Sequence, residues 1–126
     1  MKFPSELKYS KEHIWIKTDD DIGTIGITEF AESELGEIVF VDLPTIGKSF
    51  AKDEVFGSVE AIKTVSDLFM PVSGEVIDFN DKIKEQPTLV NEEPFNGGWI
   101  LKIKISNLDE LNSLLSAEQY KEIAGS

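Results

Sequence analysis

The chain has 126 residues, for which we expect a single domain spanning 1–126, and its 40% hydrophobic content argues against a disordered acidic tail. It contains no cysteine and one histidine, His13, which excludes disulfide scaffolds, thiolate zinc sites, iron–sulfur clusters and histidine-clustered metal centres. All 12 basic residues are lysines set against 24 acids, a net charge of −12, so nucleic acid and anionic membranes are not expected as partners.

The first residues, Met1–Glu6, have neither the hydrophobic run of a signal peptide nor the arginine-rich face of a transit peptide. No apolar stretch has the length needed to cross a bilayer. We therefore expect a soluble protein of the bacterial cytoplasm, or of the mitochondrial matrix if the chain is a processed eukaryotic one.

Strands dominate the predicted elements. In chain order, apolar runs bounded by turn residues predict strands at residues 14–16, 22–27, 37–43, 55–62, 64–70, 75–79 and 99–105. The first two form a hairpin across an acidic turn. This turn does not fit a calcium loop, because the sixth position counted from Asp19 is Thr24 and not glycine. We therefore predict a solvated turn.

Helices are predicted in the first third of the chain and at its C-terminus. Thr28 can cap a short helix at 29–35, which Gly36 ends. The polar, proline-containing segment 80–94 is predicted to be a loop. The C-terminal segment 107–124 predicts helices at 108–115 and 117–124. Their apolar stripes are expected to face the core, through Leu108, Leu111, Leu114, Leu115, Tyr120 and Ile123.

Lys63 stands between two strand-like runs with little turn sequence between them. This pattern predicts a tight hairpin within residues 55–70, with the Lys63 amine projecting from its tip. A solvated lysine cannot serve as a catalytic base, because lowering its pKa requires burial or cationic neighbours. The amine is instead accessible to a modifying enzyme, although a plain surface charge is the simplest interpretation of any one lysine.

Short motifs follow one another along the chain in a consistent order. They are Leu7-Lys8-Tyr9 with His13 and Trp15, Ile25–Thr28 with Leu35-Gly36, Val39–Pro44, Gly57–Glu60 leading through Lys63 to Ser66-Asp67, Pro71–Val76, Leu89–Asn91 and Gly98-Trp99. This series resembles the H protein of the glycine cleavage system, a family of lipoyl carriers. The resemblance runs from about Leu7 to Tyr120.

The resemblance, together with the strand pattern, implies a mainly β fold. We expect a barrel-sandwich hybrid, as in lipoyl domains, made of two small antiparallel sheets. A short helix near residues 28–35 and the C-terminal helices should cover its edges.

The resemblance also implies that lipoic acid is attached in amide linkage to Lys63. Glu60 and Gly74 are then expected to help a lipoate–protein ligase or lipoyl transferase recognise the hairpin. For Gly74 turn geometry alone would explain a glycine, and for Glu60 the alternative is a solvated strand face.

In this family the lipoyl arm accepts an aminomethyl group from a pyridoxal-phosphate glycine decarboxylase and presents it to a tetrahydrofolate-dependent aminomethyltransferase. Dihydrolipoyl dehydrogenase then reoxidises the dithiol. The carrier itself is expected to be monomeric and non-catalytic, contributing the effective concentration of a tethered group. Its acidic surface would guide it toward basic docking patches on these partners, or would serve solubility alone.

One position departs from the family pattern. Members usually have His-Glu-Trp where this chain has His13-Ile14-Trp15, and the glutamate is associated with holding the charged aminomethyl arm in a surface cleft. On an extended segment Glu12 would share the face of residue 14. We therefore expect Glu12 and Asp67 to replace part of the missing carboxylate. His13 is expected to line the same cleft, the alternative being a packing residue beside Trp15.

Two other function classes stay open. Ile14 is compatible with an H-protein-like lipoyl donor, or with a carrier for another pathway. A biotinyl carrier would share the hairpin-lysine arrangement, but biotinyl domains normally flank their lysine with methionines, whereas Lys63 lies between Ile62 and Thr64. Catalysis by the chain itself is not expected, since the sequence shows no nucleophile–base pair, metal cluster or phosphate-binding glycine loop.

Overall fold

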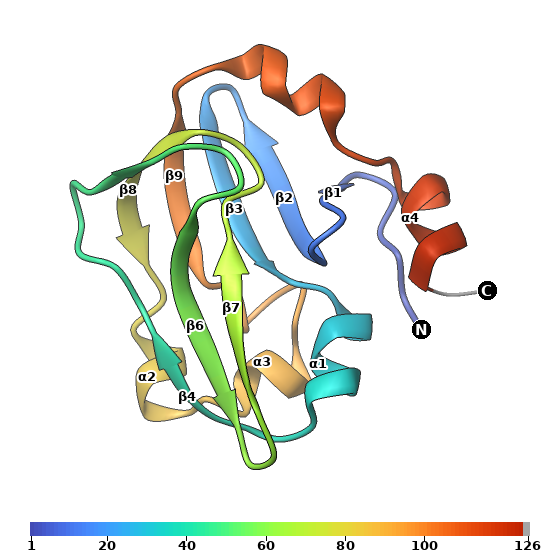
Figure 1. The fold of residues 1–126 in the computed structure, drawn as a ribbon, viewed down its shortest axis with the longest axis vertical. Helices are drawn as coiled ribbons and strands as arrows, with labels where there is room; N and C mark the ends of the chain where they lie inside the picture. The colour runs from blue at the N-terminus through green and yellow to red at the C-terminus, as the bar shows by residue number, and fades with distance from the viewer. Residues whose placement is uncertain (125–126) are drawn as a thin grey trace.

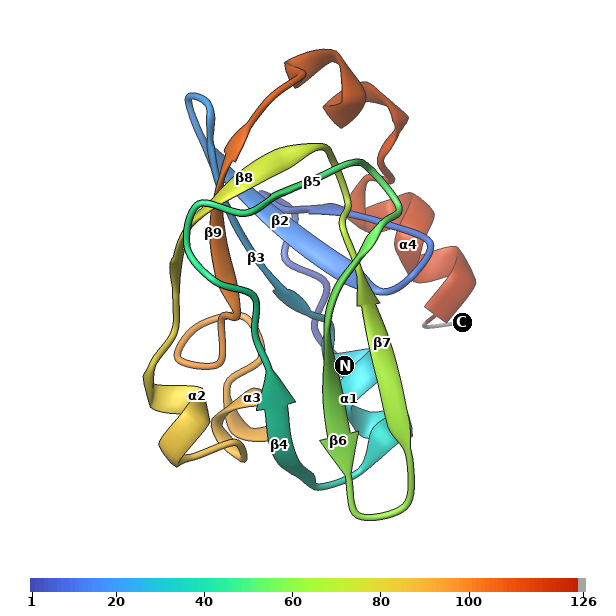
Figure 2. The same ribbon diagram turned by 60° about the vertical axis from the view of Figure 1, so that its left-hand side comes forward.

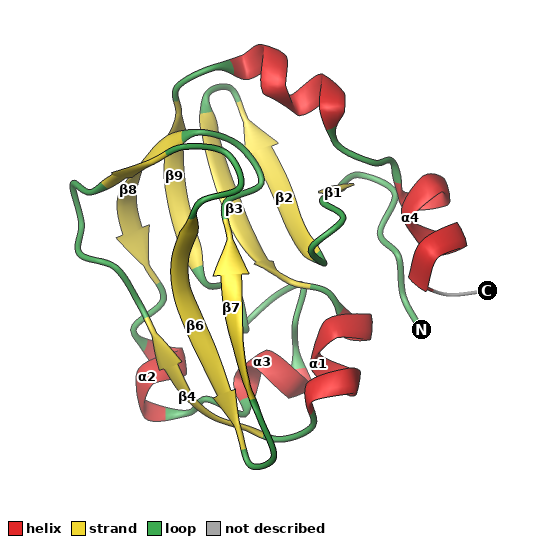
Figure 3. Cartoon of the chain, viewed as in Figure 1, coloured by secondary structure: helices red, strands yellow, loops and turns green. Residues whose placement is uncertain are grey.

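The computed structural model describes residues 1–124, which form nine strands and five short helices (Figures 1 and 3). The strands are β1 (Lys8–Tyr9), β2 (Ile14–Asp19), β3 (Ile22–Ile27), β4 (Ile38–Asp42), β5 (Ser49–Phe50), β6 (Val55–Ala61), β7 (Val65–Phe69), β8 (Gly74–Phe79) and β9 (Leu101–Ile105). The helices are α1 (Glu29–Leu35), α2 (Lys82–Glu85), α3 (Leu89–Glu92), the 3₁₀ helix η1 (Leu108–Ser113) and α4 (Ala117–Ala124). Within 1–124, no helix is both long and apolar enough to span a membrane.

The strands form two antiparallel sheets that face each other (Figure 2). The larger sheet has the order β1-β2-β3-β9-β8-β5, and the smaller has the order β4-β6-β7. Apolar side chains from both sheets fill the space between them, among them Ile25, Val59, Leu68 and Ile103. The predicted mainly β architecture of two small antiparallel sheets is confirmed, and the sheets do not close into a barrel.

Strand β2 is covered on both faces, which explains its uninterrupted apolar run. Ile14 and Ile16 belong to the core between the sheets. Trp15 points to the opposite face, where it packs in a second cluster with Tyr9 and Tyr120. Its indole nitrogen donates to the carbonyl of Pro94 at 2.9 Å, so its one polar atom is satisfied.

The predicted helix at 29–35 is confirmed, together with both of its end signals. The Thr28 hydroxyl accepts a hydrogen bond from the Ala31 N–H at 3.2 Å. Gly36 ends the helix with a φ of 81°, a conformation that favours glycine.

The prediction of a loop over 80–94 is wrong, because the segment contains α2 and α3. Ile83 in α2 and Val90 in α3 are fully buried, and each anchors one helical turn in the core. Asn80 is also buried, and its side-chain amide donates to the carbonyls of Gly97 and Trp99, both at 2.8 Å. Tertiary anchoring therefore outweighs the polar composition of this segment.

The C-terminal prediction is right for α4 and wrong for the preceding helix, which is a 3₁₀ helix that ends at Ser113. Leu114 and Tyr120 are buried as expected, whereas Leu108 and Ile123 are 50% and 53% exposed. Both helices are short, and only one side of a surface helix packs against the core. Part of the apolar stripe therefore faces solvent.

Tyr120 connects α4 to the rest of the molecule. Its ring stacks on Tyr9 with centroids 4.7 Å apart. Its hydroxyl lies 2.7 Å from the Thr28 hydroxyl and 2.8 Å from His13 Nδ1. Burial raises the pKa of Tyr120, so the hydroxyl stays neutral. One side chain thus joins the C-terminal helix, the N-cap of α1 and the turn before β2.

The variant Tyr120→Phe removes this shared hydroxyl. We expect the free energy of unfolding to fall by about 1–2 kcal/mol, because two hydrogen bonds are lost and the His13 ring nitrogen loses its partner. Urea unfolding followed by tryptophan fluorescence measures the change.

Tyr9→Phe is the matched control. Tyr9 is equally buried, but its hydroxyl has one acceptor, the carbonyl of Pro4, at 2.6 Å. A smaller loss is expected for this variant. If Tyr120→Phe were as stable as the unsubstituted chain, the hydroxyl network would not hold α4 in place.

Candidate functional site

Lys63 is exposed in the three-residue loop 62–64 that joins β6 to β7. The Ala61 N–H donates to the Thr64 carbonyl at 2.8 Å, which closes the hairpin. The Ile62 N–H donates to the carbonyl of Glu37 at 3.2 Å, which ties the loop to the connection between α1 and β4. The loop extends beyond the neighbouring helices at the end of the molecule, at the bottom of Figure 1. The Lys63 amine is therefore accessible on a backbone that is held in place.

A cleft of about 320 Å³ opens between β7, α1 and the turn before β2. Its apolar lining consists of Ile27, Phe30, Ala31, Leu35 and Leu68. Its polar lining consists of His13, Ser66 and the carboxylates of Glu12, Glu34 and Asp67. Asp67 is four residues after Lys63, which on an extended strand is roughly 13 Å. The cleft thus begins within reach of a long group attached to the lysine.

The polar lining of the cleft has a net negative charge. Three carboxylates surround it, and these favour a positively charged guest. Burial lowers the pKa of His13, while the nearby carboxylates of Glu12 and Glu34 partly oppose the shift. His13 is therefore neutral at pH 7 and does not offset the negative charge.

The structure brings Glu12, His13 and Asp67 to one cleft, but the reason given for Glu12 is wrong. Residues 11–12 form a turn, His13 has a φ of 67°, and β2 begins only at Ile14. The side chain of Ser10 fixes this turn by accepting hydrogen bonds from the Glu12 and Ile14 N–H groups, both at 3.2 Å. Ile14 is buried in the core and Glu12 is exposed, so the two residues do not share a face.

Glu60 and Gly74 lie outside the cleft. Glu60 is exposed on β6, three residues before Lys63. Gly74 is buried at the start of β8, beyond the far end of β7, and lies in a strand and not in a turn. A Cβ there would lie 2.8 Å from the Lys104 carbonyl oxygen, so close packing of β8 on β9 accounts for the glycine. A part for either residue in recognition stays a prediction.

Glu34 is a cleft residue that the sequence reasoning missed. Phe30 and Glu34 are four residues apart on α1, as are Ala31 and Leu35, and all four line the cleft. The helical spacing was the available signal, because residues i and i+4 share a face. The sequence did not show which neighbour this face of α1 would meet.

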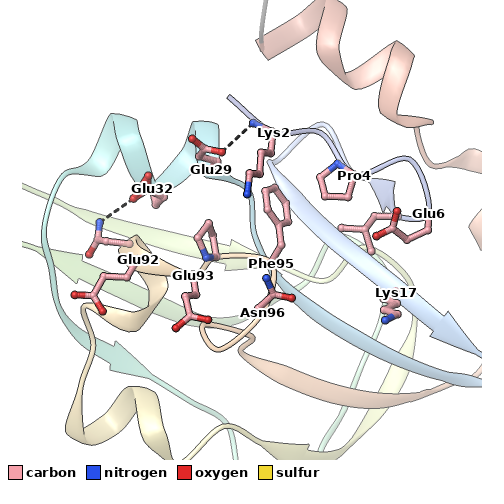
Figure 4. A pocket seen from close by; sticks show the side chains of 13 residues that line it. Lys2, Pro4, Glu6, Lys17, Glu29, Glu32, Glu92, Glu93, Phe95 and Asn96 are labelled. Carbon is pink, nitrogen blue, oxygen red and sulfur yellow. Dashed lines mark hydrogen bonds between the residues drawn. The ribbon is translucent and has the colours of Figure 1, made fainter.

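A larger hollow of about 530 Å³ lies elsewhere, between the N-terminal segment, α1 and the loop after α3 (Figure 4). Two of its lining carboxylates already accept hydrogen bonds from within the chain. The Lys2 backbone N–H donates to Glu29 at 2.9 Å, and the Asn91 side chain donates to Glu32 at 3.1 Å. Its lining contains no residue of the β6–β7 hairpin, so we take the smaller cleft beside Lys63 as the candidate site.

Comparison with known proteins agrees with this geometry. A sequence model described as "Glycine cleavage H-protein" matches residues 7–126. The glycine cleavage system H protein of Staphylococcus carnosus is 51% identical over 125 residues, covering 99% of each chain. The same protein of Bacillus cereus strain AH187 is 50% identical over 123 residues, covering 98% of this chain and 97% of the relative.

The fold is matched as well. The crystal structure of a glycine cleavage system H protein from Mycobacterium marinum superposes with a TM-score of 0.90 at 32% identity, covering 98% of this chain and 99% of the other. The chain therefore belongs to the glycine cleavage H-protein family, the non-catalytic lipoyl carriers of that system.

Proposed function

We propose that the chain carries lipoic acid on Lys63 and shuttles an aminomethyl group from glycine decarboxylase to the tetrahydrofolate-dependent aminomethyltransferase, after which dihydrolipoyl dehydrogenase reoxidises it. The observation that carries the proposal is the exposed Lys63 amine, held on a closed hairpin loop beside a cleft. When bound, lipoate supplies a dithiolane that can be reduced, can carry a one-carbon amine and can be reoxidised.

The residues beside Lys63 suit a long, mostly hydrocarbon group. Ile27, Leu35 and Leu68 give the cleft an apolar wall, against which methylene groups can be removed from water. Glu12, Glu34 and Asp67 would bind a cationic end by charge attraction. The chain's own contribution is therefore to orient the arm, to shield its far end from water and to attract a positive charge.

The expected partners follow from this role. They are the decarboxylase, the aminomethyltransferase, the dehydrogenase and a lipoate-attaching enzyme, each of which a monomeric carrier can visit in turn. The relatives from Staphylococcus carnosus and Bacillus cereus are bacterial, which supports a bacterial cytoplasmic location. The family match leaves no support for a biotinyl carrier.

One observation favours a second candidate function. Ile14 is 1% exposed in the core, so the position that usually holds a glutamate in this family cannot present a polar group to the cleft. A lipoyl donor to other proteins, or a carrier in another pathway, would not need that carboxylate. The two functions can be distinguished by incubating the lipoylated chain with glycine decarboxylase and glycine. A glycine-cleavage carrier would be reduced and loaded by the enzyme, whereas a chain that only donates lipoyl groups would not be a substrate.

Replacing Lys63 with arginine keeps the positive charge and removes the acylatable amine. Incubation with an active lipoate ligase, ATP and lipoate should add one lipoyl increment to the unsubstituted chain and none to Lys63→Arg. Intact mass with peptide mapping measures the increment. Lys104→Arg, at an exposed lysine on β9, is the control and should be modified normally. An increment retained by Lys63→Arg would place the attachment site elsewhere.

The double variant Glu12→Gln/Asp67→Asn tests the cleft. It keeps side-chain shape and removes two charges, so we expect hydrolytic loss of the aminomethyl group from the loaded carrier to rise about fivefold. Formaldehyde release over time measures the loss, and Glu34→Gln should act in the same direction.

The control for this experiment is Glu118→Gln on α4, an exposed acid that does not line the cleft. Loss from this variant should match that of the unsubstituted chain. If the double variant protected the arm equally well, the carboxylates would have no part in holding it.

A further inference from the structure

The outer face of the small sheet carries a row of exposed side chains close to Lys63. Phe40 on β4 pairs with Glu60 on β6, and Glu60 pairs with Val65 on β7. Directly paired residues point to the same face of a sheet, so these three side chains lie in one row across β4, β6 and β7. The adjacent residues Val41 and Val59 are buried between the sheets, which places the row on the outside.

This row contains large apolar groups that the fold leaves in solvent. Phe40 is 55% exposed and Val65 is 60% exposed. On the same strands Ile38, Val41 and Leu68 are buried. Ile62, next to Lys63 in the loop, is 69% exposed and extends the apolar area toward the amine. Grouped exposed apolar residues of this kind mark interaction surfaces. We call Phe40, Glu60, Ile62 and Val65 the outer-face patch.

Carboxylates border the patch. In the next row of the sheet Asp42 pairs with Ser58, and Ser58 pairs with Asp67. With Glu60 inside the patch, the face combines an apolar centre with negative charge, on a chain whose net charge is −12. A complementary partner therefore presents an apolar contact surrounded by lysine or arginine.

We propose that the outer-face patch is the docking surface for the enzyme that attaches lipoate to Lys63, with Phe40 and Val65 as its apolar contacts on either side of Glu60. The inference rests on the proposed function and extends it to β4, a strand outside the lysine hairpin.

The short length of the unmodified lysine side chain favours the lipoate-attaching enzyme over the other partners as the protein that docks here. An unmodified lysine has only a four-carbon stem, so an enzyme that acylates its amine must lie against the surface around the loop. In that transfer the neutral amine attacks an activated lipoyl carboxyl group held by the enzyme, an amide forms, and the activating group and one amine proton leave. Enzymes that act on the far end of the attached arm do not need this contact.

The experiment compares matched variants in lipoylation by a lipoate ligase with ATP and lipoate. Val65→Thr and Val55→Thr are the same substitution at opposite ends of the β6–β7 hairpin, and both positions are exposed. Phe40→Thr is paired with Ile46→Thr, an exposed position past the far end of β4. Initial rates by intact mass give KM and kcat for each variant, and urea unfolding checks that each variant is folded.

We expect Val65→Thr and Phe40→Thr each to lower kcat/KM about fivefold through KM, because each removes an apolar interface contact. Val55→Thr and Ile46→Thr should stay within about twofold of the unsubstituted chain. Val65→Thr preserves shape and strand preference, so it decides the question if Phe40→Thr unfolds.

Two other outcomes overturn the inference in distinguishable ways. The patch is not the docking surface if the unsubstituted chain is lipoylated and the patch variants have the same kcat/KM. The same conclusion follows if the control variants lose as much kcat/KM as the patch variants. If the unsubstituted chain is not modified by a ligase that modifies a known lipoyl domain, the proposed function fails together with the inference.

Discussion

The position of Lys63 depends on one asparagine, Asn91 in α3. Its side chain accepts a hydrogen bond from the Ile38 N–H at 2.9 Å and donates to the Gly36 carbonyl at 2.8 Å, which clamps the corner between α1 and β4. The Glu37 carbonyl, inside that corner, accepts the N–H of the residue before Lys63. The hydrogen bond to this exposed corner adds to the one between Ala61 and Thr64 that closes the loop.

Helix α1 links the stabilising network to the candidate site. The Thr28 cap at its start is bonded to Tyr120 of the C-terminal helix, and its outward face, with Glu34, lines the cleft. His13 takes part in both, because it contacts the Tyr120 hydroxyl, packs 4.9 Å from the Phe30 ring and lines the cleft. The C-terminal helix therefore helps to shape a surface that it does not touch, through packing and hydrogen bonds that leave His13 little freedom.

Local chemistry made much of this architecture predictable. The hairpin around the acidic turn, the capped helix at 29–35 and the strands on either side of Lys63 each have strong signals within a few residues. The errors lie where distant contacts outweigh local composition. The segment 80–94 has the polarity of a loop, but Ile83 and Val90 are buried in the core, and each stabilises one short helix. The cleft could be predicted only in part, since Glu34 enters it through the packing of α1 beside β7.

The sequence by itself determined the family motifs, the order of the strands along the chain and an accessible lysine between two strand-like runs, because these are short-range properties of residue type and spacing. Only the tertiary structure decided which side chains meet. Glu12 reaches the cleft because Ser10 fixes a turn before β2. Phe40 and Val65 lie on either side of Glu60 because β4 and β7 pair with opposite edges of β6 in register. Long-range pairing and packing set these contacts, and no local pattern specifies them.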